Sequence, residues 1–302
     1  MSDLVLVGLA GFCAALVDGA LGMGFGPTSS SILLSTGISP ASVSTTVNIA
    51  KVASGLASAV SHWRFRNIDH RLVIQLAAWG SLGAVLGVTV LSNVDGDALR
   101  PFLGGLLLVI GLRILLRFRR PVAVAPEEFR DIAHDPDRVP TFDQRGLQVV
   151  ATAGGITNGL IGAWGPLVTP FLMHRELPPR FAVGSVNTAE VAVATVSASS
   201  LVAAMGTGGL RPSVIVAMLL GGVAAAPVAA WVVRHVPARP MGVAVGALLL
   251  VTSVRELAGW AELGLARWAL YAAVALLVGL AALAPRLGRP AREPRETAAL
   301  RP

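Results

Sequence analysis

Two Gly-Pro breaks interrupt apolar segments at matching places in the two halves of the sequence. The first break is Gly22-Met-Gly-Phe-Gly-Pro27, and the second is Gly162-Ala-Trp-Gly-Pro166. Inside a bilayer, non-helical backbone is tolerated only where protein buries it or where it lines a cavity. Corresponding interruptions in two half-repeats are the best sequence pointer to the substrate site of a transporter. The breaks therefore predict the place where polar cargo is handled.

The composition predicts a membrane protein. Of the 302 residues, 54% are hydrophobic and 14% are charged, whereas a soluble domain carries about 25% charged residues. Uncharged runs such as 72–93 and 214–233 are long enough to cross a hydrocarbon core of about 30 Å. We expect an all-α, multi-pass protein of the cytoplasmic (inner) membrane. The net charge of +7 does not indicate nucleic acid binding, because the arginines lie at helix ends and in tails.

The apolar pattern predicts two membrane repeats of three spanning helices, each repeat led by a hairpin folded at its break. The expected parts are a first repeat (1–118), a cytoplasmic linker (119–145), a second repeat (146–257), an extra transmembrane helix (258–285) and a disordered basic tail (286–302). Whether segment 4–21 spans the membrane fully or is re-entrant stays open. A hairpin with one long arm and one short arm is compatible with the sequence.

The halves align at a shift of 139 positions, which is the distance from Gly26 to Gly165. Order is kept over the whole repeat, with Val47-Asn48 matching Val186-Asn187 and Arg100-Pro101 matching Arg239-Pro240. Arginines in loops 62–71, 113–120 and 234–239 place these loops in the cytoplasm. Because each repeat then crosses the membrane an odd number of times, the second repeat is expected to be inverted, as in alternating-access transporters.

The helix after each hairpin carries the sharpest polar pair. Asn48 with Lys51 in 41–62 corresponds to Asn187 with Glu190 in 181–205, and each pair shares one helix face. Lys51, the only lysine of the chain, and Glu190 lie near the expected bilayer midplane. An unpaired charge there is costly, so we expect the two to meet across the pseudo-two-fold axis. The pair suits proton coupling, and a fixed salt bridge between the halves is the alternative.

The breaks themselves are candidate anion sites. Helix N-termini carry free N–H groups and partial positive charge, and we expect short helices to begin at Pro27 and Pro166. The predicted substrate-binding residues are Gly24, Gly26, Thr28, Ser29, Asn48, Lys51, Trp164, Gly165 and Asn187. The alternatives are close helix packing by the glycines, interhelical hydrogen bonding by the asparagines and core packing by Trp164.

Asp18 and Asn158 precede the breaks and could cap or line the hairpins; Asp18 joins Glu190 and Lys51 as a candidate proton-coupling residue. No P-loop, metal-ligand spacing or Ser-His-Asp arrangement is present. The sequence therefore predicts no cofactor, no metal and no catalytic residue. The expected partners are a small anionic substrate, protons and the lipid bilayer, while a homodimer stays open.

The sequence resembles the TauE/SafE family of sulfite or organosulfonate exporters. The resemblance rests on Asp18 to Pro27, on the equivalent Asn158 to Pro166, on Asn67-Ile-Asp69 and on the glycine-rich helix from Gly80, and it covers residues 5–257. In the second break, Trp164 stands where glycine is usual. The resemblance implies outward transport of sulfur-containing or related organic anions, coupled to the proton gradient.

The leading hypothesis is a secondary transporter for sulfite, a sulfonate or a similar anion. An uptake permease for a carboxylate, a membrane scaffold or partner subunit without transport, and an intramembrane enzyme are the competing hypotheses. Against the enzyme stands the absence of a nucleophile–base or metal motif.

Overall fold

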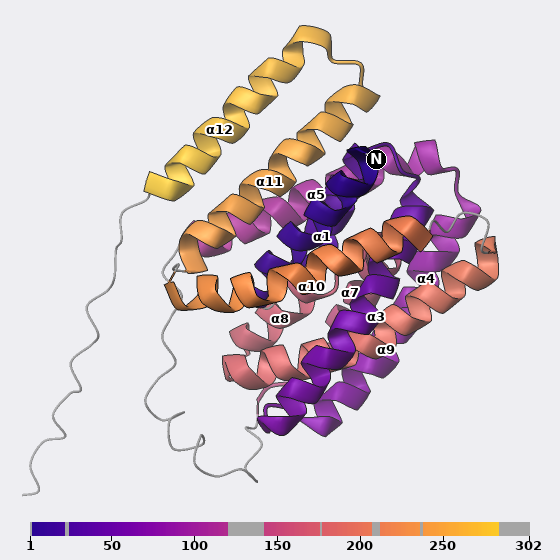
Figure 1. The fold of residues 1–302 in the computed structure, drawn as a ribbon, viewed down its shortest axis with the longest axis vertical. Coiled ribbons are helices and arrows are strands. Elements are labelled where there is room, and N and C mark those ends of the chain that lie inside the picture. The colour runs from indigo at the N-terminus through magenta and orange to yellow at the C-terminus, as the bar shows by residue number, and fades with distance from the viewer. Residues whose placement is uncertain are drawn as a thin grey trace, which may run out of the picture.

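The computed structural model describes residues 2–21, 24–119, 142–175, 177–206, 212–235 and 238–283. All regular elements in these ranges are helices (Figure 1). In chain order they are α1 (Ser2–Leu21), α2 (Phe25–Ser35), α3 (Pro40–Arg64), α4 (His70–Asn93), α5 (Gly96–Arg119), α7 (Leu147–Ile161), α8 (Gly165–His174), α9 (Pro179–Met205), α10 (Pro212–His235), α11 (Ala238–Trp260), η1 (Gly264–Ala266) and α12 (Arg267–Leu283). Most of the predicted linker (119–145) and the whole predicted tail (286–302) lie outside the described residues.

The surface of the helix bundle is apolar, as a lipid environment requires. Within the described ranges, 5 helices are long and apolar enough to cross a membrane: 70–93, 96–118, 181–205, 242–260 and 264–283. Ile74, Val149 and Val223, on three different helices, are 69%, 72% and 71% exposed. Such exposure is unfavourable in water but matches hydrocarbon. The predicted all-α, multi-pass membrane architecture is thus confirmed.

Both breaks are hairpin turns built on glycine. Gly24 before α2 has φ of 132°, and Gly162 after α7 has φ of 68°. These left-handed backbone conformations are accessible to glycine at little cost. The chain folds back at each turn, so that α1 packs on α2 and α7 packs on α8. The arms are unequal, with 20 and 11 residues in the first hairpin and 15 and 10 in the second.

The short helices begin slightly earlier than the proline positions indicate. Helix α2 starts at Phe25 rather than Pro27, and α8 starts at Gly165 rather than Pro166. The N–H groups of a first helical turn have no intrahelical partner. Proline is therefore tolerated throughout that turn and does not mark its first residue.

Helix pairing between the halves follows the internal repeat. Helix α1 packs along α10, and the corresponding α7 packs along α4. The central α3 pairs with its counterpart α9, and α5 pairs with α11. Helix α12 lies at the edge of the bundle beside α11 (Figure 1). Each half thus buries its helices mainly against the other half, and neither is a separate packing unit.

Glycines set the close approach of the two equivalent pairs α4–α7 and α1–α10. A Cβ on Gly83 or Gly87 of α4 would collide with backbone of α7, and one on Gly155 of α7 would collide with backbone of α4. In the other pair, Gly11 faces the backbone of α10 and Gly221 faces the backbone of α1. Small residues that let backbones approach are a main source of helix association in membranes.

We expect Gly83→Leu to destabilise the bundle, because the new side chain would meet the carbonyl oxygen of Thr152 and the Ile156 amide. Overpacking of this kind costs about 1–3 kcal/mol or more. The measurement is the unfolding temperature of the purified protein in detergent. Gly105→Leu is the matched control, since a Cβ at Gly105 meets nothing within 4 Å. Equal unfolding temperatures for the two variants would contradict the close-packing role of Gly83.

Candidate functional site

The two hairpin turns touch each other through glycine backbone. A Cβ built on Gly26, in the first turn of α2, would overlap the carbonyl group of Gly162. A Cβ built on Gly162 would lie 3.6 Å from the Cα of Gly26. The turns of the two halves therefore meet inside the protein, at a contact that requires a residue without a side chain at position 26.

A small cavity lies at this meeting point. Its free volume is about 10 Å³, which is roughly the space that one water molecule requires. The lining comes from both hairpins and from α3 and α9: Asp18, Gly24, Phe25, Gly26, Pro27, Lys51, Gly162, Trp164, Gly165, Pro166, Asn187 and Glu190. The N-terminal turns of both short helices, α2 and α8, thus face one cavity.

The C-terminal carbonyls of α7 end inside the protein and are paired by the first half of the chain. A helix end leaves several carbonyls without intrahelical partners, and no bulk water reaches them in a membrane. Side chains of α2 and α3 donate to four of them: Ser30 to the Ile161 carbonyl (2.5 Å), Ser44 to that of Gly159 (2.7 Å), Asn48 to that of Asn158 (3.2 Å) and Lys51 to that of Gly162 (2.7 Å). Within the turn, the Gly162 amide also donates to the Asn158 carbonyl, at 2.7 Å. This end of the second hairpin is therefore held by the first half.

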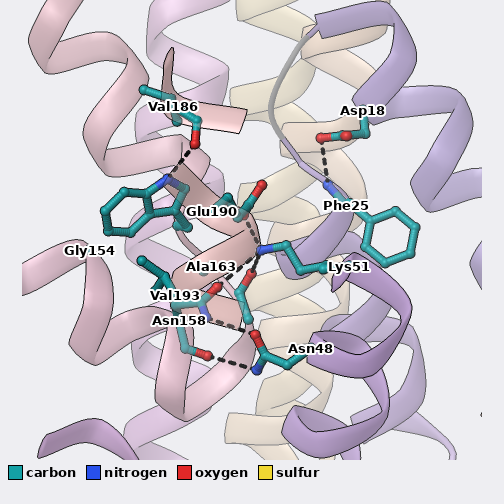
Figure 2. Close-up of polar contacts among 12 residues, drawn as sticks. Asp18, Phe25, Asn48, Lys51, Gly154, Asn158, Ala163, Val186, Glu190 and Val193 are labelled. Atoms are coloured by element: carbon teal, nitrogen blue, oxygen red, sulfur yellow. Dashed lines mark hydrogen bonds and ion pairs between the residues drawn. The ribbon is translucent and has the colours of Figure 1, made fainter. Parts of the chain in front are cut away.

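Lys51 joins both halves through its ammonium group, as Figure 2 shows. Its Nζ donates to the carbonyl of Gly162 (2.7 Å) and to Oδ1 of Asn158 (3.1 Å), and it forms an ion pair with Glu190. The Lys51 side chain is only 4% exposed, against 18% for Glu190. An ammonium carries three N–H donors, so these contacts use all of them. The expected meeting of Lys51 and Glu190 at equivalent repeat positions is present.

Asn158 is the centre of a buried polar network below Lys51. Its Nδ2 donates to Oδ1 of Asn48 (2.7 Å), as Figure 2 shows. The same Nδ2 also donates to the hydroxyl of Ser197 (2.9 Å). Asn48 in turn donates to the carbonyl of Ser44 at 2.9 Å. Asn48, Asn158, Ser44 and Ser197 are all fully buried. A fully paired network of this kind fixes the orientation of the amide oxygen that contacts Lys51.

Asp18 holds the first hairpin turn. Its carboxylate accepts the backbone N–H of Phe25 at 3.3 Å, at the start of α2. A carboxylate at a helix N-terminus is stabilised by the free N–H groups and the helix dipole. Because Asp18 and Glu190 both line the cavity, two carboxyl groups share it with the single ammonium of Lys51.

Trp164 forms one wall of the cavity and is also part of the core. Its ring is fully buried, and its Nε1 donates to the carbonyl of Val186 at 3.2 Å. Gly80 and Gly154 leave the room that the ring occupies, since a Cβ on either would lie 2.6 Å or 3.1 Å from it. Trp164 therefore both lines the cavity and packs in the hydrophobic core, so both roles expected from the sequence fit its position.

Most of the predicted site residues line the cavity, but three do not. Gly24, Gly26, Lys51, Trp164, Gly165 and Asn187 line it, as do Asp18 and Glu190. The Ser29 hydroxyl instead donates to the carbonyl of Phe25 at 2.5 Å, and Asn48 binds the end of α7. Thr28 is fully buried and its hydroxyl has no hydrogen-bond partner within the described residues. The side-chain amide of Asn187 donates to the hydroxyl of Ser58 at 3.5 Å.

Sequence reasoning gave Asn158 less weight than its contacts justify and missed Ser44 and Ser197. A usable signal existed for Ser44, because Ser44, Asn48 and Lys51 follow the helical spacing of one face. No comparable signal marks Ser197. Among the residues that the structure describes, no group of three or more His, Cys, Asp or Glu side chains is placed to hold a metal ion.

We expect Gly26→Ala to disrupt the contact between the hairpin turns, because even a methyl group would overlap the backbone of Gly162. Separation of the turns would lower the unfolding temperature. Thermal unfolding of the purified protein in detergent is the measurement. Gly105→Ala, at an open helical position, is the control. An unchanged unfolding temperature in Gly26→Ala would contradict the close contact between the turns.

Comparison with known proteins identifies the family. Residues 7–256 match the family described as sulfite exporter TauE/SafE. The chain is also 35% identical over 258 residues to the probable membrane transporter protein YtnM of Bacillus subtilis (strain 168), a match that covers 85% of this chain and 83% of that protein. No solved structure matches the chain. The chain therefore belongs to the sulfite exporter TauE/SafE family.

Proposed function

We propose that this chain exports a small anion across the cytoplasmic membrane, with sulfite, a sulfonate or a similar organic anion as cargo and alternating access as the mechanism. Family membership and the transporter relative support a membrane transporter rather than an enzyme. The cargo class, the direction, the membrane and a link to proton movement are parts of the proposal.

One observation carries the proposal: a buried ammonium lies where two helix N-termini face one cavity. Lys51, Gly26 and Gly165 all line it. Free N–H groups and the positive end of the helix dipole favour anions at such a point. An ammonium adds a charged donor, and hydrogen bonds to charged groups contribute about 1.5–3 kcal/mol each. A compact oxyanion with several acceptors fits this set of donors better than a cation or a neutral solute does.

The small volume supports a mechanism with moving halves. About 10 Å³ is too little for a sulfur oxyanion, so the hairpin turns must separate when cargo enters. The two halves pack on each other along α3–α9 and α5–α11, so rocking of one half against the other along these pairs would open the turn contact. In transporters with inverted repeats, such rocking exposes a midplane site to one side of the membrane at a time.

The competing functions differ in what they predict for flux. An uptake permease for a carboxylate would use the same donors, because carboxylates and sulfonates are both oxyanions. Inward and outward flux of both anion classes in reconstituted vesicles would separate these two functions. A scaffold or partner subunit predicts that neither class moves.

We expect Lys51→Ala and Glu190→Gln each to reduce flux in vesicles by at least about tenfold, because a lost charge-assisted contact costs about 1.5–3 kcal/mol. Anion flux at equal protein incorporation is the measurement. The matched controls are Arg71→Ala, an exposed basic residue, and Asp97→Asn, whose side chain is 86% exposed. Wild-type flux in both Lys51→Ala and Glu190→Gln would contradict the proposed role of this ion pair in transport.

A further inference from the structure

Two carboxylates of the protein already occupy the hydrogen-bond donors that an incoming anion would bind. Glu190 forms the ion pair with Lys51, and Asp18 accepts the N–H of Phe25 at the start of α2 (Figure 2). These are an ammonium and a helix N-terminus, the two kinds of anion donor that face the cavity. Each resident carboxylate is thus the direct competitor of the cargo for one donor.

Lys51 has no further donor to offer an incoming anion. Its three N–H groups are used by Gly162, Asn158 and Glu190. The first two acceptors belong to the end of α7, which the first half of the chain pairs at several further points. Glu190 belongs to a different helix and is the more exposed partner, at 18%. The contact that gives way to an anion is therefore the one with Glu190.

Binding of an anion would leave the cavity with an excess of negative charge. Among the described residues that line it, the charged groups are Lys51 on α3, Asp18 on α1 and Glu190 on α9, while α2, α7 and α8 contribute uncharged groups. With all three ionised, the set carries one excess negative charge, and a bound anion would add at least one more. Buried charges without partners are costly and are relieved when a carboxylate takes up a proton.

We propose, resting on the function above, that the anion displaces Glu190 from Lys51 and that proton uptake by the cavity carboxylates, chiefly Glu190, accompanies binding. The anion takes the donor of Lys51, and the proton neutralises the displaced carboxyl group. Binding of anion and proton is then mutually favourable, and linkage requires each to raise the affinity for the other equally.

The test is isothermal titration of ethanesulfonate into the purified full chain in lipid nanodiscs. Ethanesulfonate stays a monoanion from mildly acidic to mildly alkaline pH, so its own titration does not contribute. Titrations in two buffers of different ionisation heat give the number of protons taken up per anion. We expect uptake of about one proton and a rise in affinity of up to about tenfold for each unit of acidification.

Variants assign the proton to its carboxyl group. Glu190→Gln cannot take up the proton and should bind ethanesulfonate with most of the proton uptake and pH dependence removed. Asp18→Asn should remove only a smaller part. Asp97→Asn, on the exposed surface, is the matched control and should keep the wild-type pH dependence. Proton uptake by the wild-type protein remains measurable if Glu190→Gln fails to fold.

Wild-type binding that is independent of pH, or that releases protons, would overturn this inference and leave the anion transporter in place. The same holds if Glu190→Gln keeps the full wild-type proton uptake. Absence of binding by sulfite, sulfonates and carboxylates at every pH, with the protein folded, would remove the proposed function and this inference together.

Discussion

A helix that ends inside a membrane must find donors for its last carbonyls, and this requirement organises the centre of the structure. Helix α7 stops at Gly162, and the freed carbonyls are bound by side chains of α2 and α3. Lys51 is the charged member of this set, placed at the negative end of the α7 dipole. The same contacts that stabilise the broken helix therefore position the ammonium at the cavity, so a structural role of Lys51 and its proposed role in anion binding are compatible.

Glycines shape the cavity region both in the hairpin turns and along the helix pairs that hold the hairpins. In the turns, Gly24 and Gly162 supply backbone conformations that reverse the chain, while Gly26 allows the turns to touch. Along the α4–α7 and α1–α10 pairs, glycines let the helices approach closely enough to hold each hairpin against the opposite half. The turns therefore meet through the backbone of Gly26 and Gly162.

The repeat in the sequence predicted much of this arrangement, because equivalent positions of two related halves converge on their common axis. It predicted the two hairpins and the contact between Lys51 and Glu190, and it offered capping as one of two roles for Asp18. It did not predict that the second turn directs the Gly162 carbonyl toward Lys51. Which backbone atom faces inward depends on the dihedral angles of a turn, and residue types restrict these angles without fixing them. The positions of the Ser29 and Thr28 hydroxyls, outside the cavity lining, could not be predicted for a similar reason, since rotation of the side chain decides their partners.

The opposite charges at Lys51 and Glu190 also determine which halves can combine. These positions correspond in the repeat, and their side chains meet between α3 and α9. Two copies of the first half would bring ammonium against ammonium at this point, and two copies of the second half would oppose two carboxylates. Like charges in a medium of low dielectric constant repel strongly. Each half therefore pairs favourably only with the other half. Charge repulsion at this point would destabilise a symmetric assembly of two identical halves.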